Sequence, residues 1–183
     1  MNNTCWVWLR PPLKRTIFAL LILFAIPSVY AEAKDLTREL GLQRYGSGEL
    51  RRFGFLIYEA QLWGVSNATN PVQPPMALQL TYKREIAGKK IVEASVDQMR
   101  ALGANESQLD AWAAAMSRIF PDVKPGDQLV GIYRPGSATF IYNNREIGEV
   151  RDPDFARLFF GIWLDPRTSE PRLREKLLRS GAG

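Results

Sequence analysis

Tyrosines and arginines are the residues of this sequence whose types and spacing are best suited to chemistry. The tyrosines lie in segments that we predict to be strands, and two arginines closely follow such strands. The group comprises Tyr58, Tyr82, Tyr133, Tyr142, Arg84 and Arg134. Phenols and a guanidinium gathered at one end of a sheet would hold a carboxylate or an enolate through neutral and charge-assisted hydrogen bonds. The alternative is structural, because strands favour tyrosine for packing and carry exposed arginine at their ends.

Trp112 is a further candidate for contact with a ligand. Together with Trp63 and Trp163 it is most simply a core residue of the fold. Aromatic side chains around a cleft would also suit an apolar ligand, so both interpretations stay open for these three tryptophans.

The composition excludes several classes of catalytic and metal-binding site. The 183-residue chain has no histidine and one cysteine, Cys5, so it can form neither a Ser-His or Cys-His couple nor a histidine-based zinc site. The pair Gly46 and Gly48 lacks the lysine and the third glycine of phosphate-binding loops, which favours a bend or a β-bulge there. We therefore expect no metal and no cofactor.

Residues 1–31 have the pattern of a secretory signal peptide. Basic residues without any acid precede an apolar run from Ile17 to Ile26, and small residues follow it. We predict cleavage after Ala31 or Ala33 and a periplasmic or secreted mature protein. The alternative is a retained membrane anchor, but the run is shorter than the about 20 apolar residues that cross a bilayer.

The charge of the mature chain gives little reason to expect nucleic acid as a partner. The whole chain has 24 basic and 19 acidic residues and a net charge of +5. Removal of residues 1–31 takes three basic residues and no acid, which lowers the net charge to +2. The remaining cations are interleaved with acids and form no stripe. We expect membrane contact only through the signal segment before its cleavage.

Residues 36–179 predict one α+β domain in which an antiparallel sheet is covered by helices on one face. The predicted strands lie within 42–63, as a pair joined by a turn, and at 77–84, 129–134 and 138–142. The predicted helices begin at Gly88, under an Asn105 cap, at Asp152 and at Pro171. The glycine pair at 46 and 48 is expected at a bend or bulge of the first strand.

Four segments of the chain carry a more specific pattern. They are residues 46–63 (GSGELRRFGFLIYEAQLW), 80–86 (LTYKREI), 120–127 (FPDVKPGD) and 155–164 (FARLFFGIWL). In this order they resemble the chalcone isomerase-like proteins, in particular their bacterial secreted branch. The resemblance implies an open-faced β-sandwich, with a ligand cleft between the antiparallel sheet and the helices.

The functional residues of that family transfer poorly to this sequence. In the plant enzymes of the family that the chain resembles, a chalcone closes to a flavanone with the help of an arginine after the glycine turn and of nearby Thr and Tyr hydroxyls. Its fatty-acid-binding members hold the lipid carboxylate with the corresponding arginine and a tyrosine. These positions fall on Leu50, Phe53 and, for a helical tyrosine, near Met99. Arg51 stays a candidate, because a β-bulge would turn it to the face of residue 50.

The first hypothesis is therefore a secreted, non-catalytic domain that binds a small apolar or amphipathic ligand such as a fatty acid or a phenolic compound. The candidate ligand-binding residues are Arg51, Tyr58, Tyr82, Arg84, Trp112 and Tyr133; no catalytic residue is predicted. Two alternatives stay open. One is an active intramolecular lyase of the chalcone isomerase type that uses Arg51 or Arg84 with Tyr58 or Tyr82, and the other is a structural module of a periplasmic assembly.

Overall fold

The structure, a computed structural model, describes residue 38, residues 40–65 and residues 72–179. The predicted signal peptide, residues 1–31, lies outside the described residues. Within the part that is described, no helix is long and apolar enough to span a bilayer.

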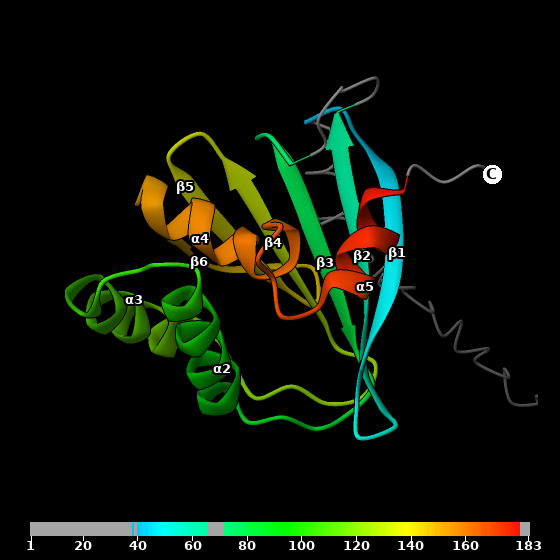
Figure 1. The fold of residues 1–183 in the computed structure, drawn as a ribbon, viewed down its shortest axis with the longest axis horizontal. Helices are drawn as coiled ribbons and strands as arrows, with labels where there is room; N and C mark the ends of the chain where they lie inside the picture. The colour runs from blue at the N-terminus through cyan, green and yellow to red at the C-terminus, as the bar shows by residue number, and fades with distance from the viewer. Residues whose placement is uncertain (1–37, 39, 66–71, 180–183) are drawn as a thin grey trace, which may run out of the picture.

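A single antiparallel sheet of six strands forms the body of the molecule, and each strand pairs with its neighbours in sequence (Figure 1). The strands are β1 (Leu42–Arg52), β2 (Phe55–Val65), β3 (Met76–Tyr82), β4 (Gln128–Arg134), β5 (Ser137–Tyr142) and β6 (Arg145–Val150). The helices are α2 (Gly88–Ala101), α3 (Glu106–Ile119), α4 (Pro153–Leu164) and α5 (Pro171–Leu178). Helices α4 and α5 lie against one face of the sheet, with α2 and α3 beside α4. The predicted α+β class is confirmed.

Helix starts follow the capping signals of the sequence. The Asn105 side chain accepts a hydrogen bond from the backbone N–H of Gln108, at 2.9 Å, and begins α3. The Asp152 carboxylate does the same for the N–H groups of Asp154 and Phe155 at the start of α4. Both residues satisfy backbone donors that a helix leaves without an intrahelical partner, which is why they mark helix starts in the sequence.

The first hairpin reverses at residues that the sequence did not single out as a turn. Arg52 pairs with Phe55, so the turn consists of Phe53 and Gly54, with φ of +50° and +82°. Positive φ at both central residues is the pattern of a type I′ turn, whose usual residues are Asn, Asp and Gly. The sequence did not indicate a turn here, because a large aromatic residue such as Phe53 normally indicates a strand.

The glycine pair in β1 serves the packing of α5. A Cβ at Gly46 would collide with the carbonyl oxygen of Leu177, and one at Gly48 would lie 2.7 Å from Leu173 Cδ1. The predicted bulge is also present, since the register of β1 against β2 shifts at Tyr45. The missing side chains let α5 pack directly on β1, which closes the helical layer at that edge of the sheet.

Phenylalanines fill the space between α4 and the sheet. Phe159 stacks on Phe155 at 5.4 Å between ring centres and meets Phe140 of β5 edge-on at 5.1 Å. Phe120, which follows α3, meets Phe140 edge-on at 4.9 Å. This cluster holds α4 at a fixed distance from the sheet, and the space between α4, α2 and the first strands is where the cavity described next lies.

Candidate functional site

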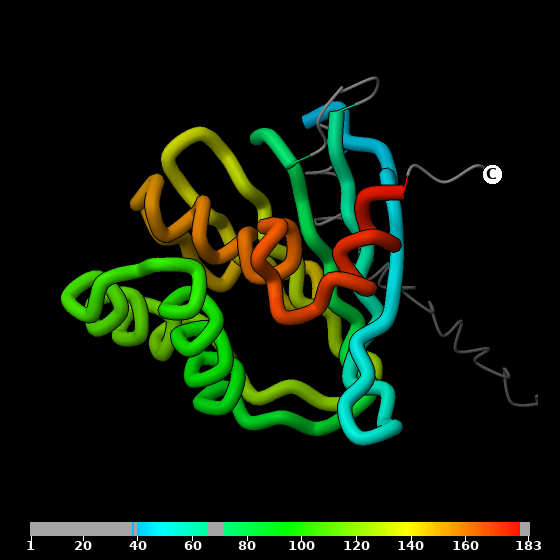
Figure 2. The backbone as a smooth tube through the Cα atoms, viewed as in Figure 1, coloured from blue at the N-terminus to red at the C-terminus, as the bar shows by residue number. Residues whose placement is uncertain are grey.

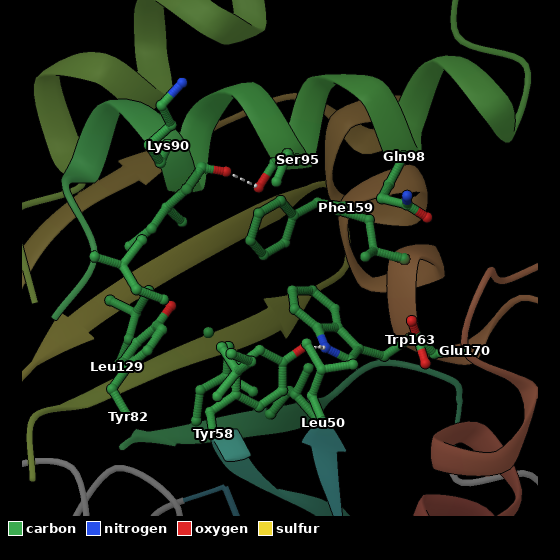
Figure 3. A pocket seen from close by; sticks show the side chains of 18 of the residues that line it. Leu50, Tyr58, Tyr82, Lys90, Ser95, Gln98, Leu129, Phe159, Trp163 and Glu170 are labelled. Atoms are coloured by element: carbon green, nitrogen blue, oxygen red, sulfur yellow. Dashed lines mark hydrogen bonds between the residues drawn. The ribbon is translucent and has the colours of Figure 1, made fainter. Parts of the chain in front are cut away.

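A largely apolar cavity of about 230 Å³ lies between the sheet and helices α2 and α4 (Figure 3). Its volume is slightly below the ~300–1,000 Å³ of typical small-molecule sites. Its walls include Leu50, Leu78, Leu80, Ile91, Leu129, Phe159 and Ile162. The cavity is therefore suited to a short apolar group rather than to a large one.

Strand alternation explains which residues of β1 and β3 face the cavity. Leu50 and Arg52, two residues apart, both line it, and Arg51 between them does not. The same period of two brings Leu80 and Tyr82 of β3 to the cavity.

A β-bulge lies beside these residues, but in β2 and not in β1. Leu50 pairs with Tyr58 and Arg51 pairs with Leu56, so Ile57 is the extra residue. Both Ile57 and Tyr58 line the cavity as a result. Since β1 keeps its alternation, the bulge does not turn Arg51 inward.

Tyr58, Tyr82 and Trp163 form the polar group inside the cavity. Tyr58 and Tyr82 are opposite each other in β2 and β3, with ring centres 5.9 Å apart. The indole Nε1–H of Trp163 donates a hydrogen bond of 2.9 Å to the Tyr58 hydroxyl oxygen, shown dashed in Figure 3. The Tyr58 hydroxyl therefore keeps its own proton for donation to another acceptor.

Burial raises the pKa of Tyr58 and of Tyr82 well above the ordinary phenol value. For Tyr58 the hydrogen bond from Trp163 acts in the opposite direction but is the smaller effect. Both phenols are therefore neutral at physiological pH. They can donate hydrogen bonds there, but they are not poised to act as general bases.

Charged and polar side chains lie at the rim of the cavity. Arg52 Nη2 is 3.2 Å from the Glu170 carboxylate, and both residues line the cavity. Ser169 Oγ donates a hydrogen bond of 2.8 Å to Gln98 Oε1, which links the α4–α5 connection to α2. Lys90 also belongs to the lining, but its ammonium points away from the cavity in Figure 3 and pairs with Glu93. Arg52 is therefore the cation best placed for a ligand headgroup.

Two of the six predicted ligand-binding residues, Tyr58 and Tyr82, line this cavity, and the arginines Arg51 and Arg84 do not. Arg51 pairs with Glu49 at 2.9 Å on the exposed side of β1. The Arg84 guanidinium lies 4.5 Å from the centre of the Phe55 ring. Neither guanidinium is among the cavity-lining groups, because strand alternation and the position after β3 direct both to the surface.

Trp112 and Tyr133 are likewise absent from the lining of this cavity. The Trp112 indole donates a hydrogen bond of 2.9 Å to the Asp152 carboxylate, and Tyr133 stacks on Phe160 with ring centres 5.0 Å apart. Tyr133 lies opposite Met76, at the end of β3 away from Tyr82, because neighbouring strands are antiparallel. The tyrosines therefore do not all gather at one end of the sheet.

Three residues of the site were not among the candidates from the sequence: Arg52, Trp163 and Glu170. Arg52 had a usable signal, since it shares a strand face with Leu50. Trp163 had only the general suitability of an aromatic side chain for an apolar cleft, and its contact with Tyr58 joins residues 105 positions apart. Glu170 had no signal in the sequence.

The positions where family resemblance would put polar groups are apolar here and lie in three different environments. Leu50 lines the cavity. Phe53 is 98% exposed at the turn of the hairpin, and Met99 is fully buried in the core. Among the described residues, no group of three or more acidic, cysteine or histidine side chains is arranged to hold a metal ion.

Comparison with known proteins gives consistent matches. A sequence model described as chalcone isomerase-like matches residues 37–179. An uncharacterized protein of Haemophilus influenzae is 27% identical over 136 residues, which are 74% of this chain and 67% of that protein. The crystal structure of a fatty-acid-binding protein of Arabidopsis thaliana is similar in fold, with a TM-score of 0.53 and 11% sequence identity. The similarity covers 76% of this chain and 85% of that one.

Proposed function

Since the chain belongs to the chalcone isomerase-like family, we propose that it is a non-catalytic binding protein for a small amphipathic molecule with an anionic headgroup, such as a medium-chain fatty acid. The observation that carries this proposal is an apolar cavity that holds two neutral phenols and has the cation Arg52 at its rim. The fold that it shares with a fatty-acid-binding protein supports the same ligand class.

The apolar part of the ligand would bind among the leucine, isoleucine and phenylalanine side chains of the cavity. Burial of each methylene contributes about 0.8 kcal/mol, so a short chain gains several kcal/mol from this contact alone. A carboxylate at the rim would replace Glu170 as the partner of Arg52, and the Tyr58 hydroxyl offers a hydrogen bond further in. The size of the cavity favours a medium chain over a long one.

Three features argue for binding without catalysis. The position of the family's functional arginine is Leu50, and that of its threonine is Phe53 at the exposed turn. The two phenols in the cavity have raised pKa values, so neither supplies a phenolate at neutral pH. Acid–base chemistry requires a group that titrates near the working pH, and the tyrosines of the cavity do not provide one.

Binding of decanoate, followed by isothermal titration calorimetry, tests the proposal. Arg52→Gln removes the rim cation and is expected to weaken decanoate binding by about tenfold, the effect of losing one charged hydrogen bond. Arg51→Gln is the matched control, because Arg51 is equally exposed, has its own ion pair with Glu49 and does not line the cavity. Methyl decanoate lacks the carboxylate, so Arg52→Gln should leave its binding unchanged.

Two results would contradict the proposal. One is the absence of binding heat when decanoate is titrated into the protein at concentrations up to its critical micelle concentration. The other is turnover of a chalcone by the protein well above the rate in solvent, which would replace binding by catalysis. Equal losses in the Arg51 and Arg52 variants would refute the assignment of the headgroup to Arg52.

The proposed site of action is the periplasm or the medium. This part rests on the sequence pattern of residues 1–31 alone. Expression of the full sequence in a bacterium, followed by fractionation and N-terminal sequencing, is expected to give a soluble protein that begins at Glu32 or Lys34. Recovery from the cytoplasm with residues 1–31 still attached would contradict it.

A further inference from the structure

The turn of the β1–β2 hairpin exposes two aromatic side chains at one end of the molecule. Phe53 is 98% exposed, and Phe55 next to the turn is 56% exposed. In Figure 2 this turn, in cyan, projects at the bottom of the view, beyond the connection between β3 and α2. Scattered apolar residues on a surface are ordinary, but two phenylalanines at one projecting turn form a compact apolar tip.

The backbone of the turn gives no structural reason for a phenylalanine. Phe53 has φ of +50°, in the left-handed region that is unfavourable for a residue with a Cβ atom. Asn, Asp and Gly occupy such turns at lower cost. Because Phe53 neither suits the turn nor contributes to the core, its presence points to a contact outside the chain.

Cations surround this apolar tip on both sides. Arg51 and Arg52 precede the turn in β1. Lys83 is held beside β2 by a hydrogen bond of 2.8 Å from its backbone N–H to the Ile57 carbonyl oxygen, and Arg84 follows with its guanidinium over the Phe55 ring.

Acidic side chains balance part of this charge. Arg51 pairs with Glu49, Lys83 with Glu59 and Arg52 with Glu170, and Glu49 and Glu59 face each other across β1 and β2. Exposed ion pairs of this kind contribute little and exchange readily. Among the described residues Arg84 has no acidic partner at all. The outermost surface therefore combines aromatic rings with positive charge.

We propose that this hairpin tip docks on the surface of an anionic lipid bilayer. The two rings would enter the boundary between headgroups and acyl chains, where aromatic side chains are favoured, and Arg51, Lys83 and Arg84 would lie at the level of the phosphates. Leu50 and Arg52 of the same strand line the ligand cavity, so docking brings the rim of the cavity close to the bilayer. The proposal goes beyond the proposed function, and it adds a second membrane contact to the signal segment inferred from the sequence.

A fluorescent probe at the tip tests this contact directly. In the full chain with Cys5→Ser, Phe53→Cys carries an environment-sensitive dye, and Val65→Cys, which is 40% exposed at the opposite end of β2, is the matched control. Vesicles of equal parts phosphatidylcholine and phosphatidylglycerol are expected to shift the emission of the dye at position 53 to the blue and to leave position 65 unchanged. High salt or pure phosphatidylcholine should remove most of the shift.

The unlabelled variant Phe53→Asn separates docking from folding. Asn suits the turn, so the variant should fold with an unchanged or higher melting temperature while its affinity for the same vesicles falls about tenfold or more. If the N-terminal segment is not cleaved, it contributes equally to the vesicle binding of every variant. Decanoate binding should stay unchanged, which distinguishes failure of this proposal from failure of the proposed function. Equal vesicle affinity of Phe53→Asn and the unmodified protein, or equal shifts at positions 53 and 65, would overturn it.

Discussion

The β1–β2 hairpin places aromatic side chains in two opposite environments only a few residues apart. Tyr58 is partly buried, packs against the core and accepts a hydrogen bond from Trp163 of α4, and Phe53 is 98% exposed at the turn. By residue type alone, both tyrosine and phenylalanine could belong to a core. The difference is made by what crosses the strand at each point: α4 lies over Tyr58, and the turn projects beyond the helices.

The two regions therefore respond in opposite ways to loss of an aromatic group. On the cavity side, packing and hydrogen bonds depend on the aromatic group, so its removal lowers the free energy of unfolding. At the tip the ring has little contact, so its removal leaves stability unchanged or improves it. The predictions that follow test this contrast.

Replacement of Phe159 has the largest expected effect. Phe159→Ala removes a ring that packs against Phe140, Phe155 and Trp163, and we expect a loss of about 3–5 kcal/mol in the free energy of unfolding. Phe55→Ala at the tip should change it by less than about 0.5 kcal/mol. Chemical denaturation measures both values. Similar losses for the two variants would show that the contrast is wrong.

The hydrogen bond between Trp163 and Tyr58 comes next. Tyr58→Phe leaves the indole N–H without its acceptor, and we expect a loss of about 1–3 kcal/mol. Trp163→Phe in the same background should cost less than it does alone, because the partner is already absent. Additive losses in this double-mutant cycle would indicate that the two groups do not interact.

These residues also show how far sequence reasoning reaches. The alternation of β3 and the caps Asn105 and Asp152 are local signals, and the structure confirms the elements that they predicted. Tyr58 and Tyr82 were candidates before the structure was considered, and both line the cavity.

The structure departs from the expectations of the sequence where non-local geometry decides. Arg51 was a candidate because a bulge in β1 would turn it to the face of residue 50, but the bulge at this point is in β2, and Arg52 lines the cavity. The turn at Phe53 was missed because phenylalanine is not a turn residue. Trp163 meets Tyr58 only because α4 packs back over the first hairpin, and no spacing in the sequence encodes that contact.

A pH-dependent effect is expected in the connection between α4 and α5, which borders the cavity. The pKa of Asp165 is lowered from 3.8 to about 2, mainly by hydrogen bonding from the Arg167 side chain. The hydrogen bond from the Arg167 backbone N–H acts in the same direction and is the smaller effect. The stabilisation is fully present above pH 4 and is lost as the pH falls through 2, because the unfolded chain binds a proton first.

Asp165→Asn should therefore lower the free energy of unfolding by about 1 kcal/mol at pH 7, a value reduced by the exposure of Arg167. The difference from the unmodified protein should disappear towards pH 2. Urea denaturation at a series of pH values measures this, and a difference that is constant from pH 7 to pH 2 would contradict the assignment.

The smallest expected effect is a gain at the turn. Phe53→Asn relieves the left-handed backbone of a phenylalanine, and we expect a stabilisation of about 0.5–1 kcal/mol, or roughly 2–4 °C in melting temperature. Phe55→Asn is the control and should give no gain, because Phe55 lies in β2 and does not have a positive φ. Destabilisation by Phe53→Asn would mean that the ring has a structural role at the tip.

The central claim is that the cavity between the sheet and α2 and α4 holds an amphipathic ligand. The most direct measurement follows the tryptophan indole N–H signals by NMR while decanoate is added. The Trp163 signal is expected to shift and saturate, because its N–H lies at the cavity next to Tyr58. The Trp112 signal should stay in place, since its N–H is bonded to Asp152 outside the cavity lining. A Trp163 signal that does not move at saturating decanoate would contradict the account.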